Sequence, residues 1–156
     1  MSDTYTEIYY HLVWTTKNRE PMIVPPMEET LHTSIKAICR DARVTIHALN
    51  GLPDHVHLAC TLPATVAAAP LMNKMKGGSA HLVNHLPEGR HPLAWQPGYG
   101  ALTFARRDLK TIVAYLRCRL YPKSTAASWE RYTLAKYGTL RHRAAFFQPR
   151  RGFVTF

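Results

Sequence analysis

The chain has 156 residues, 46% of them hydrophobic, and its 20 Lys and Arg against 10 Asp and Glu give a formal net charge of +10. This length can bury one full core and leaves little room for a second domain. Three separated cysteines, no leader-like amino terminus and no apolar run of membrane-spanning length exclude a disulfide-stapled secreted scaffold and a membrane protein, and indicate a reduced, cytoplasmic protein.

The first half of the chain begins with a predicted strand and a predicted helix. Residues 7–17 are rich in aromatic and β-branched side chains and end in the turn sequence NREP, as a strand does. In residues 27–41, Leu31, Ile35 and Ile38 recur at the spacing of one helix face. We therefore expect an amphipathic helix there.

A hairpin and a second helix are predicted next. Residues 44–49 and 55–62 form two short strands, joined by a linker that is longer than a minimal turn. Residues 65–86 are helical in pattern, but Gly77 and Gly78 lower helix propensity. We expect the helix to be interrupted there, with space for a close backbone approach.

The last elements are a strand at residues 100–105 and a helix at residues 108–120, which Pro122 stops. The order is strand, helix, strand, strand, helix, strand, helix. It predicts an α+β sandwich of the ferredoxin-like kind, with an antiparallel sheet and a carboxy-terminal helix.

Two histidines lie one residue apart in the stretch PDHVHLACTL. On a strand, His55 and His57 project to one face, whereas Val56, Leu58 and Cys60 face the other. Two imidazoles in this arrangement can hold one metal ion. An H-x-H pair alone is a weak signal, so paired core histidines remain the alternative.

The last predicted helix carries a tyrosine away from its apolar stripe. That stripe consists of Leu109, Ile112, Val113, Leu116 and Leu120. Tyr115 lies roughly 120° from its centre. Lys110, Arg117 and Arg119 flank the phenol with positive charge that suits phosphate.

A metal site, a phenol and a basic surface together suggest phosphodiester chemistry. The ion would polarise the scissile phosphate, and the phenolate would attack phosphorus and hold one DNA end covalently. A tyrosine has an ordinary pKa near 10, so the nucleophile needs help from the metal, from cations or from a proton acceptor.

Five stretches, in order, resemble the landmarks of the HUH-class single-tyrosine transposases, which include the REP-associated tyrosine transposases. They are YHLVWTTKNREP, LNGLPDHVHLACTLP, KGGSAHLVNHL, WQPGYGALTFA and IVAYLRCRL. The resemblance implies a ferredoxin-like fold, a homodimer, a Mg²⁺ or Mn²⁺ ion, recognition of single-stranded or hairpin DNA, and a 5′-phosphotyrosine intermediate. It implies that His55 and His57 are metal ligands and that Tyr115 is the nucleophile.

One position departs from the family pattern. The insertion-sequence members have a Gln one helical turn after the tyrosine, which completes the metal site, and this chain has Arg119 there. A guanidinium offers no lone pair to a cation. Water or Asp54 could fill the position, Arg119 could bind the scissile phosphate, or cleavage could be impaired.

Three further aromatic side chains could belong to the predicted site, and each has an alternative structural interpretation. Tyr121 is a rival nucleophile, although its place at the helix end favours packing. His11 could line the metal site from the first strand, but a hydrogen-bonded core histidine is the favoured interpretation, and His47 has the same one.

Further residues are candidate DNA contacts. Gln96 and Tyr99 could stack on or hydrogen-bond to exposed bases, and a structural turn explains them nearly as well. The basic candidates are Lys74, Lys76, Arg106, Arg107, Lys110, Arg117 and Arg119. For Lys74 and Lys76 a solvated helix face is the alternative.

Charge is also uneven along the chain. From residue 110 onward, ten basic residues face one acid, Glu130. We expect a transposase-like domain over residues 1–127 and a basic, aromatic tail over residues 128–156 that packs against DNA or a partner subunit.

Three hypotheses follow. The first is a metal-dependent transposase or nickase acting on single-stranded DNA. The second is a domesticated relative that binds DNA hairpins without efficient cleavage. The third is an RNA-binding ferredoxin-like domain, which would prefer an RNA stem-loop because only RNA offers the 2′-hydroxyl.

Overall fold

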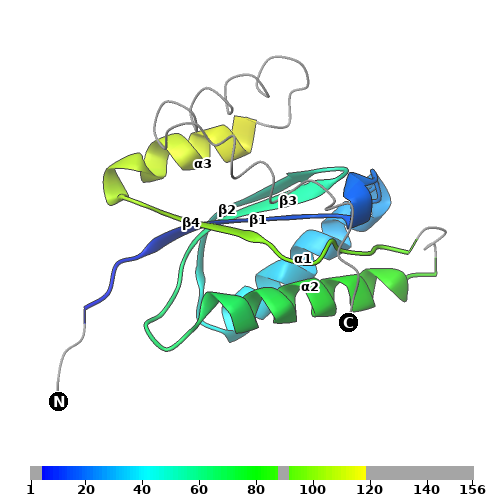
Figure 1. The fold of residues 1–156 in the computed structure, drawn as a ribbon, viewed down its shortest axis with the longest axis horizontal. Coiled ribbons are helices and arrows are strands. Elements are labelled where there is room, and N and C mark those ends of the chain that lie inside the picture. The colour runs from blue at the N-terminus through cyan, green and yellow to red at the C-terminus, as the bar shows by residue number, and fades with distance from the viewer. Residues whose placement is uncertain (1–4, 88–91, 119–156) are drawn as a thin grey trace, which may run out of the picture. The chain divides into compact units, whose positions relative to one another are not determined.

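The fold is taken from a computed structural model, which describes residues 5–87 and 92–118 (Figure 1). The elements in order are β1 (Tyr9–Thr15), α1 (Pro25–Asp41), β2 (Thr45–Leu52), β3 (His55–Thr61), α2 (Ala68–Asn84), β4 (Gly100–Phe104) and α3 (Leu109–Cys118). Single 3₁₀ turns follow β1 at Lys17–Arg19 and β4 at Arg106–Asp108.

The four strands form one antiparallel sheet in the order β2-β3-β1-β4. Helices α1 and α2 cover one face of this sheet, and α3 lies on the other (Figure 1). The βαββαβ order with this strand arrangement is ferredoxin-like, so the predicted α+β class is confirmed.

The main core lies between the sheet and the helix pair α1 and α2. Alternate strand residues point into it because successive side chains on a strand face opposite ways. Trp14 on β1 and Val56 and Leu58 on β3 are fully buried there. Their partners from the helices include Leu31 and Met72, which are also fully buried.

The predicted interruption of α2 is wrong, because the helix runs without a break from Ala68 to Asn84. Packing explains the glycine at position 78. A Cβ there would stand 3.0 Å from Cδ1 of Ile38 on α1, so glycine lets the two helices approach closely. This contact is to a side chain and no heavy atom lies within 4 Å of a Cβ at Gly77, so the structure does not show the expected close backbone approach at these glycines.

The predicted long hairpin linker is also wrong. β2 continues to Leu52, which pairs with His55, so the loop consists of Pro53 and Asp54 alone. Gly51 permits this extension because a Cβ there would stand only 2.7 Å from the carbonyl oxygen of His55. The turn therefore ends directly at the first histidine of the pair.

None of the helices in the described ranges is both long and apolar enough to cross a membrane. The predicted boundary between residues 127 and 128 and the predicted tail lie outside the described residues.

Candidate active site

Three histidines share the sheet face on which α3 lies. His55 and His57 stand on β3, and His11 stands on the neighbouring strand β1, where the register pairs it with Ala59. All three are buried, with exposed fractions of 6%, 3% and 2% for His55, His57 and His11. Strand alternation thus places both predicted ligands on one face, as the sequence pattern indicates.

The rings are arranged closely enough to act together. The ring centroids of His55 and His57 are 4.9 Å apart and their planes meet edge to face. His11 stacks on His57 with centroids 5.1 Å apart, and its Nε2 lies 2.9 Å from Nδ1 of His57. His11 is therefore a buried, hydrogen-bonded histidine as favoured above, and its partner is the second candidate ligand.

Asp54 is the hydrogen-bond partner of the first ligand candidate. Nδ1 of His55 donates to Oδ1 of Asp54. The other carboxylate oxygen, Oδ2, accepts a hydrogen bond from Nε of Arg19 at 3.2 Å. The Nη2 atom of Arg19 also lies 3.2 Å from Oδ2. Burial raises the pKa of Asp54, but the charges and hydrogen bonds of His55 and Arg19 outweigh burial and leave that pKa below its usual value.

This arrangement fits the chemistry of a metal ligand. A metal-bound histidine ordinarily donates its second ring nitrogen to a carboxylate or another acceptor, as His55 does to Asp54. The candidate donors are then the Nε2 atoms of His55 and His57. The described residues contain no group of three or more His, Cys, Asp or Glu side chains placed to hold a metal ion. Two imidazoles would therefore need oxygen ligands from outside this set.

Helix α3 brings Tyr115 to the same sheet face. Ile112 and Leu116 bury against Ala48 on β2 and Ala59 on β3, and Tyr115 packs against this small cluster. The tyrosine is half-buried with its hydroxyl oxygen buried. Ala59 is two residues from His57 on the same face of β3, so nucleophile candidate and ligand candidates share one surface.

A side-chain amide attaches α3 to the sheet. Asn50 on β2 is buried, and its Nδ2 donates to the backbone carbonyl oxygen of Leu116. That carbonyl lies near the end of the described part of α3, so the amide joins this turn of the helix to β2. Asn50 also stands opposite His57 in the register of β2 and β3.

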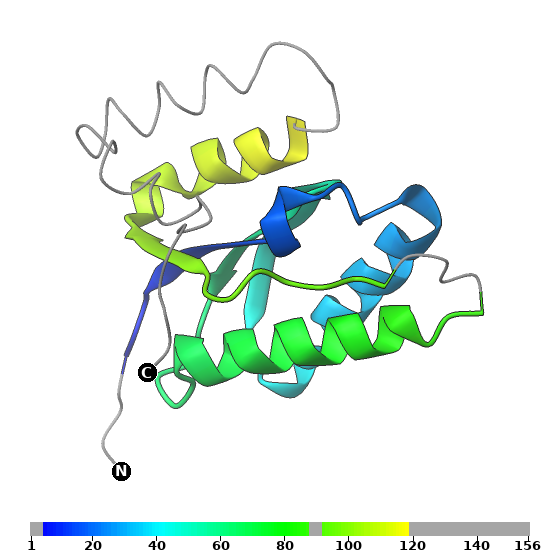
Figure 2. The same ribbon diagram turned by 45° about the vertical axis from the view of Figure 1, so that its right-hand side comes forward.

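Three of the predicted DNA contacts have structural partners. Nζ of Lys76 donates to the carbonyl oxygens of Gln96 and Gly98, both at 2.8 Å, and burial lowers the pKa of Lys76. The side-chain oxygen of Gln96 accepts from the backbone N–H of Asn18 at 3.0 Å. Tyr99 packs at the edge of the main core. Figure 2 shows this loop running beside α2.

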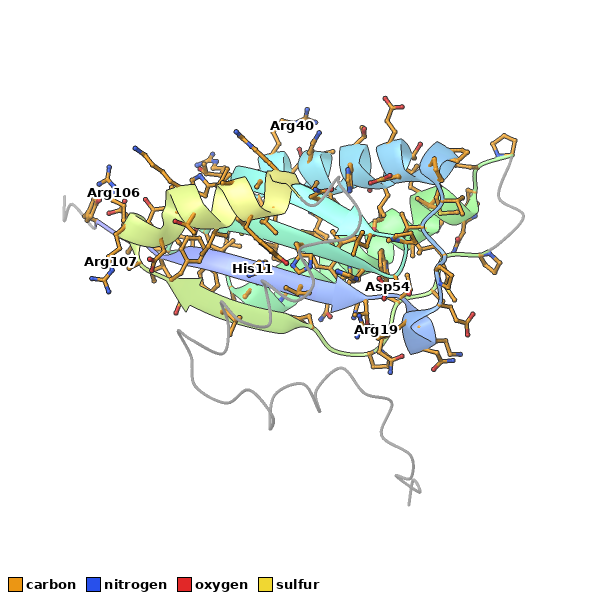
Figure 3. The ribbon with its side chains drawn as sticks, turned by 90° about the horizontal axis from the view of Figure 1, so that it is seen from above. His11, Arg19, Arg40, Asp54, Arg106 and Arg107 are labelled. Carbon is orange, nitrogen blue, oxygen red and sulfur yellow. The ribbon has the colours of Figure 1, made fainter. Side chains whose placement is uncertain are left out.

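The other predicted contacts are exposed side chains. Lys74 is on α2, Lys110 and Arg117 are on α3, and Arg106 and Arg107 precede α3. Nη1 of Arg106 lies 3.5 Å from Oε1 of Glu7. Figure 3 shows Arg106 and Arg107 at the opposite end of the sheet from Asp54 and Arg19. Arg119 and Tyr121 lie outside the described residues.

His47 is remote from the candidate ligands. It sits at the bulge of β2, where its Nε2 lies 2.8 Å from Oγ1 of Thr61 and its ring contacts Tyr9. The hydrogen bond agrees with the favoured interpretation of His47 as a hydrogen-bonded core histidine, but the residue is half-buried and is not part of the core.

Sequence reasoning missed Arg19 and Asn50. Arg19 lies in the turn sequence NREP, and nothing in the spacing connects it with Asp54, 35 residues later. Asn50 resembles an ordinary turn residue because Gly51 follows it. The sequence carries no signal for either contact, because each joins segments that only the folded sheet brings together.

Comparison with known proteins assigns this arrangement to a family. The family model described as "Transposase IS200 like" matches residues 4–118. The ISDra2 transposase TnpA of Deinococcus radiodurans is 25% identical over 115 residues, which cover 70% of this chain and 82% of that protein.

Solved structures agree with the fold. A crystal structure assigned to a transposase of Deinococcus radiodurans has a TM-score of 0.60 at 25% identity and covers 75% of this chain and 95% of that one. A REP-associated tyrosine transposase bound to a REP hairpin has a TM-score of 0.58 at 20% identity, with coverage of 100% and 94%. On the family match, which spans the sheet, the histidine pair and α3, this chain belongs to the IS200-like transposases.

Proposed function

We propose that the protein cleaves and rejoins single-stranded DNA at hairpin-flanked ends, with Tyr115 as nucleophile and His55 and His57 as ligands of a divalent ion. The observation that carries the proposal is the common sheet face: both imidazoles and the tyrosine helix lie on it, and α1 and α2 cover the other. The family match supports the reaction class.

The reaction divides into two transesterifications. The Tyr115 oxygen attacks phosphorus, the bond from phosphorus to the 3′ oxygen breaks, and the upstream strand leaves with a 3′-hydroxyl. The downstream strand stays on the protein as a 5′-phosphotyrosine. A 3′-hydroxyl then attacks the same phosphorus and restores the phenol, so one phosphodiester replaces another without an external energy source.

A bound divalent ion would polarise the phosphate and neutralise charge that develops on it. His55 and His57 would hold the ion through Nε2. Because Mg²⁺ strongly prefers oxygen ligands and imidazole nitrogens suit transition metals, this donor pair favours Mn²⁺ of the two expected ions. The exposed Lys110 and Arg117, on the tyrosine helix, supply positive charge for the DNA backbone.

Covalent capture tests the proposal. A hairpin oligonucleotide labelled at its 3′ end should become attached to the protein in Mn²⁺ and should stay free in EDTA. The Tyr115→Phe variant should capture nothing. Tyr10→Phe is the matched control, because Tyr10 packs against the main core on the other sheet face. Capture that survives in Tyr115→Phe, or that is unaffected by EDTA, contradicts the mechanism.

The second candidate function is hairpin binding with impaired cleavage. Arg119 favours it, since it stands where a ligand is expected and offers no lone pair. This function predicts salt-sensitive binding and no adduct with any divalent ion. If capture appears in Arg119→Gln and not in the parent chain, Arg119 silences the site.

We also propose that the protein acts as a homodimer, as the resemblance of its sequence to single-tyrosine transposases implies. Light scattering on the purified chain should give twice the monomer mass of 17.7 kDa. A monomer that still forms the adduct would show that one subunit is sufficient.

A further inference from the structure

The two-residue turn that precedes β3 is hydrogen-bonded to the segment that follows β1. The backbone N–H of Thr16 donates to the carbonyl oxygen of Asp54 at 2.9 Å, and the single hydroxyl proton of Thr16 is shared between the carbonyl oxygens of Glu20, at 2.6 Å, and Asp54, at 3.1 Å. The N–H of Ile23 donates to the carbonyl oxygen of Pro53 at 2.9 Å. Arg19 adds its contacts to the Asp54 carboxylate. The segment after β1 therefore fixes both the backbone and the side chain of the residue before His55.

That segment is itself held in a disfavoured conformation. Asn18 and Arg19 have φ values of 55° and 58°, in the left-handed region that residues with a Cβ seldom occupy. The Asn18 N–H is bonded to the Gln96 side chain, and the Lys17 N–H donates to the carbonyl oxygen of Ala94. Residues at such angles persist only where their surroundings determine them, and here the result is that Arg19 faces Asp54 (Figure 3).

The hydrogen bond from Asp54 also has a chemical consequence. An ionised carboxylate can only accept, so the proton between Asp54 and His55 belongs to Nδ1 of the imidazole. A neutral His55 then has its lone pair on Nε2. The bond between His57 and His11 can run either way, and only donation from Nδ1 of His57 leaves a lone pair on Nε2 of His57.

We propose that Asp54, oriented by Arg19, and His11 are positioning residues that fix the tautomers of His55 and His57, so that both rings present Nε2 to one ion. The proposal rests on the proposed function for the identity of the ion's ligands. It adds that three further residues, from the first strand, the following turn and the hairpin loop, prepare the site before metal or DNA arrives. None of the three touches the reacting atoms.

The first test measures the tautomers directly. Long-range ¹H–¹⁵N spectra of metal-free protein labelled on histidine nitrogens, recorded at a pH where the ¹⁵N shifts themselves show neutral rings, should show protonated Nδ1 and bare Nε2 for His55 and His57. His11 should also carry its proton on Nδ1. A proton on Nε2 of His55 in the parent protein would overturn the proposal without any substitution.

The second test removes the partners. In Asp54→Ala, His55 should lose its fixed tautomer, and Mn²⁺ affinity measured by calorimetry should fall about 10- to 100-fold, the usual cost of losing a ligand's hydrogen-bond partner. Asp54→Asn leaves one acceptor oxygen for two donors, so with that oxygen facing Arg19 the amide NH₂ faces Nδ1 of His55; the proton of His55 should move to Nε2, and Mn²⁺ affinity should fall at least as far as in Asp54→Ala. In His11→Phe, the tautomer of His57 should change while that of His55 stays.

Matched controls come from an ion pair elsewhere in the molecule. Arg40 and Asp41 on α1 form an exposed pair with a separation of 3.8 Å, far from Asp54 (Figure 3). Asp41→Ala and Arg40→Ala make the same charge changes as Asp54→Ala and Arg19→Ala and should leave tautomers and Mn²⁺ affinity unchanged. Arg19→Ala should weaken Mn²⁺ binding, but less than Asp54→Ala does.

The results separate this proposal from the proposed function. If the tautomers respond as expected and no DNA adduct forms, the positioning role stands and the cleavage function fails. If the adduct forms and a folded Asp54→Ala protein keeps both the His55 tautomer and the Mn²⁺ affinity, the positioning role is wrong.

Discussion

The attachment of the tyrosine helix to the sheet depends heavily on Asn50. Most of the stability of a helix in a protein comes from tertiary packing, and the described part of α3, Leu109–Cys118, packs on the sheet through few residues. Its buried apolar contacts come from Ile112 and Leu116, and the amide of Asn50 adds the bond to the Leu116 carbonyl. Asn50→Ala should therefore loosen α3 more than it loosens the rest of the domain.

The expected loss of stability in Asn50→Ala follows from the buried hydrogen bond between Asn50 and the Leu116 carbonyl. A net hydrogen bond contributes about 1 kcal/mol, and truncating a buried side chain that makes one costs about 1–3 kcal/mol. We expect the free energy of unfolding to fall by about 2 kcal/mol, which for a chain of this size lowers Tm by roughly 4–8 °C. A displaced nucleophile should also slow adduct formation on the order of 10-fold or more.

Asn84→Ala provides the comparison. Asn84 on α2 donates to the Leu93 carbonyl at 3.0 Å and accepts from the Leu93 N–H at 2.6 Å, on the other side of the sheet. Its loss should destabilise the domain by a similar amount. The assays are chemical denaturation, hydrogen exchange at the α3 amides and the rate of covalent capture. If α3 exchange is unchanged in Asn50→Ala, or if both variants slow capture equally, the reasoning about Asn50 is refuted.

Four further outcomes are expected from other parts of the fold. Gly51→Ala should destabilise the domain because the new Cβ would stand 2.7 Å from a backbone oxygen of β3. Gly77→Ala on α2 should stabilise the domain by up to about 1 kcal/mol, because no heavy atom lies within 4 Å of the new Cβ and alanine favours a helix. Urea denaturation distinguishes the two, and a neutral Gly51→Ala would contradict the close approach. Burial raises the pKa of Cys39 to about 11 and that of Cys60 to about 12, so at pH 8 both stay thiols and should resist alkylation until the protein unfolds. Rapid labelling of either native cysteine, detected by peptide mass spectrometry, would contradict their burial. Lys76→Met should lower Tm because two carbonyls lose their donor, and an unchanged Tm with weaker DNA binding would instead favour a contact to phosphate.

The sequence predicts the elements and the histidine face well because both depend on local periodicity. Alternation on a strand is sufficient to place His55 and His57 together. Helical spacing predicts Tyr115 away from the stripe that contains Ile112 and Leu116, whereas in the structure its ring packs against that cluster, because the sheet surface reaches beyond the stripe. Such patterns need no knowledge of distant contacts. The ferredoxin-like order follows from them and is confirmed by the sheet.

The sequence-based predictions are wrong or incomplete where a residue contacts a segment that is distant in the chain. Gly78 lowers helix propensity locally, but packing against Ile38 on another helix explains it within a continuous α2. Lys76 has the charge expected of a phosphate contact. In the structure its ammonium group donates to two backbone carbonyl oxygens of a loop, 20 and 22 residues later in the chain. The bond between Arg19 and Asp54 joins residues whose proximity follows only from the completed sheet.

Peptide mapping of the covalent adduct tests the central claim most directly. Trypsin places Tyr115 in the peptide of residues 111–117, TIVAYLR, and the rival Tyr121 in the separate peptide LYPK. After capture of a hairpin oligonucleotide in Mn²⁺ and trimming of the DNA, mass spectrometry should find the nucleotide phosphate on TIVAYLR. The modification on LYPK, or its absence from every tyrosine peptide, would contradict cleavage by Tyr115.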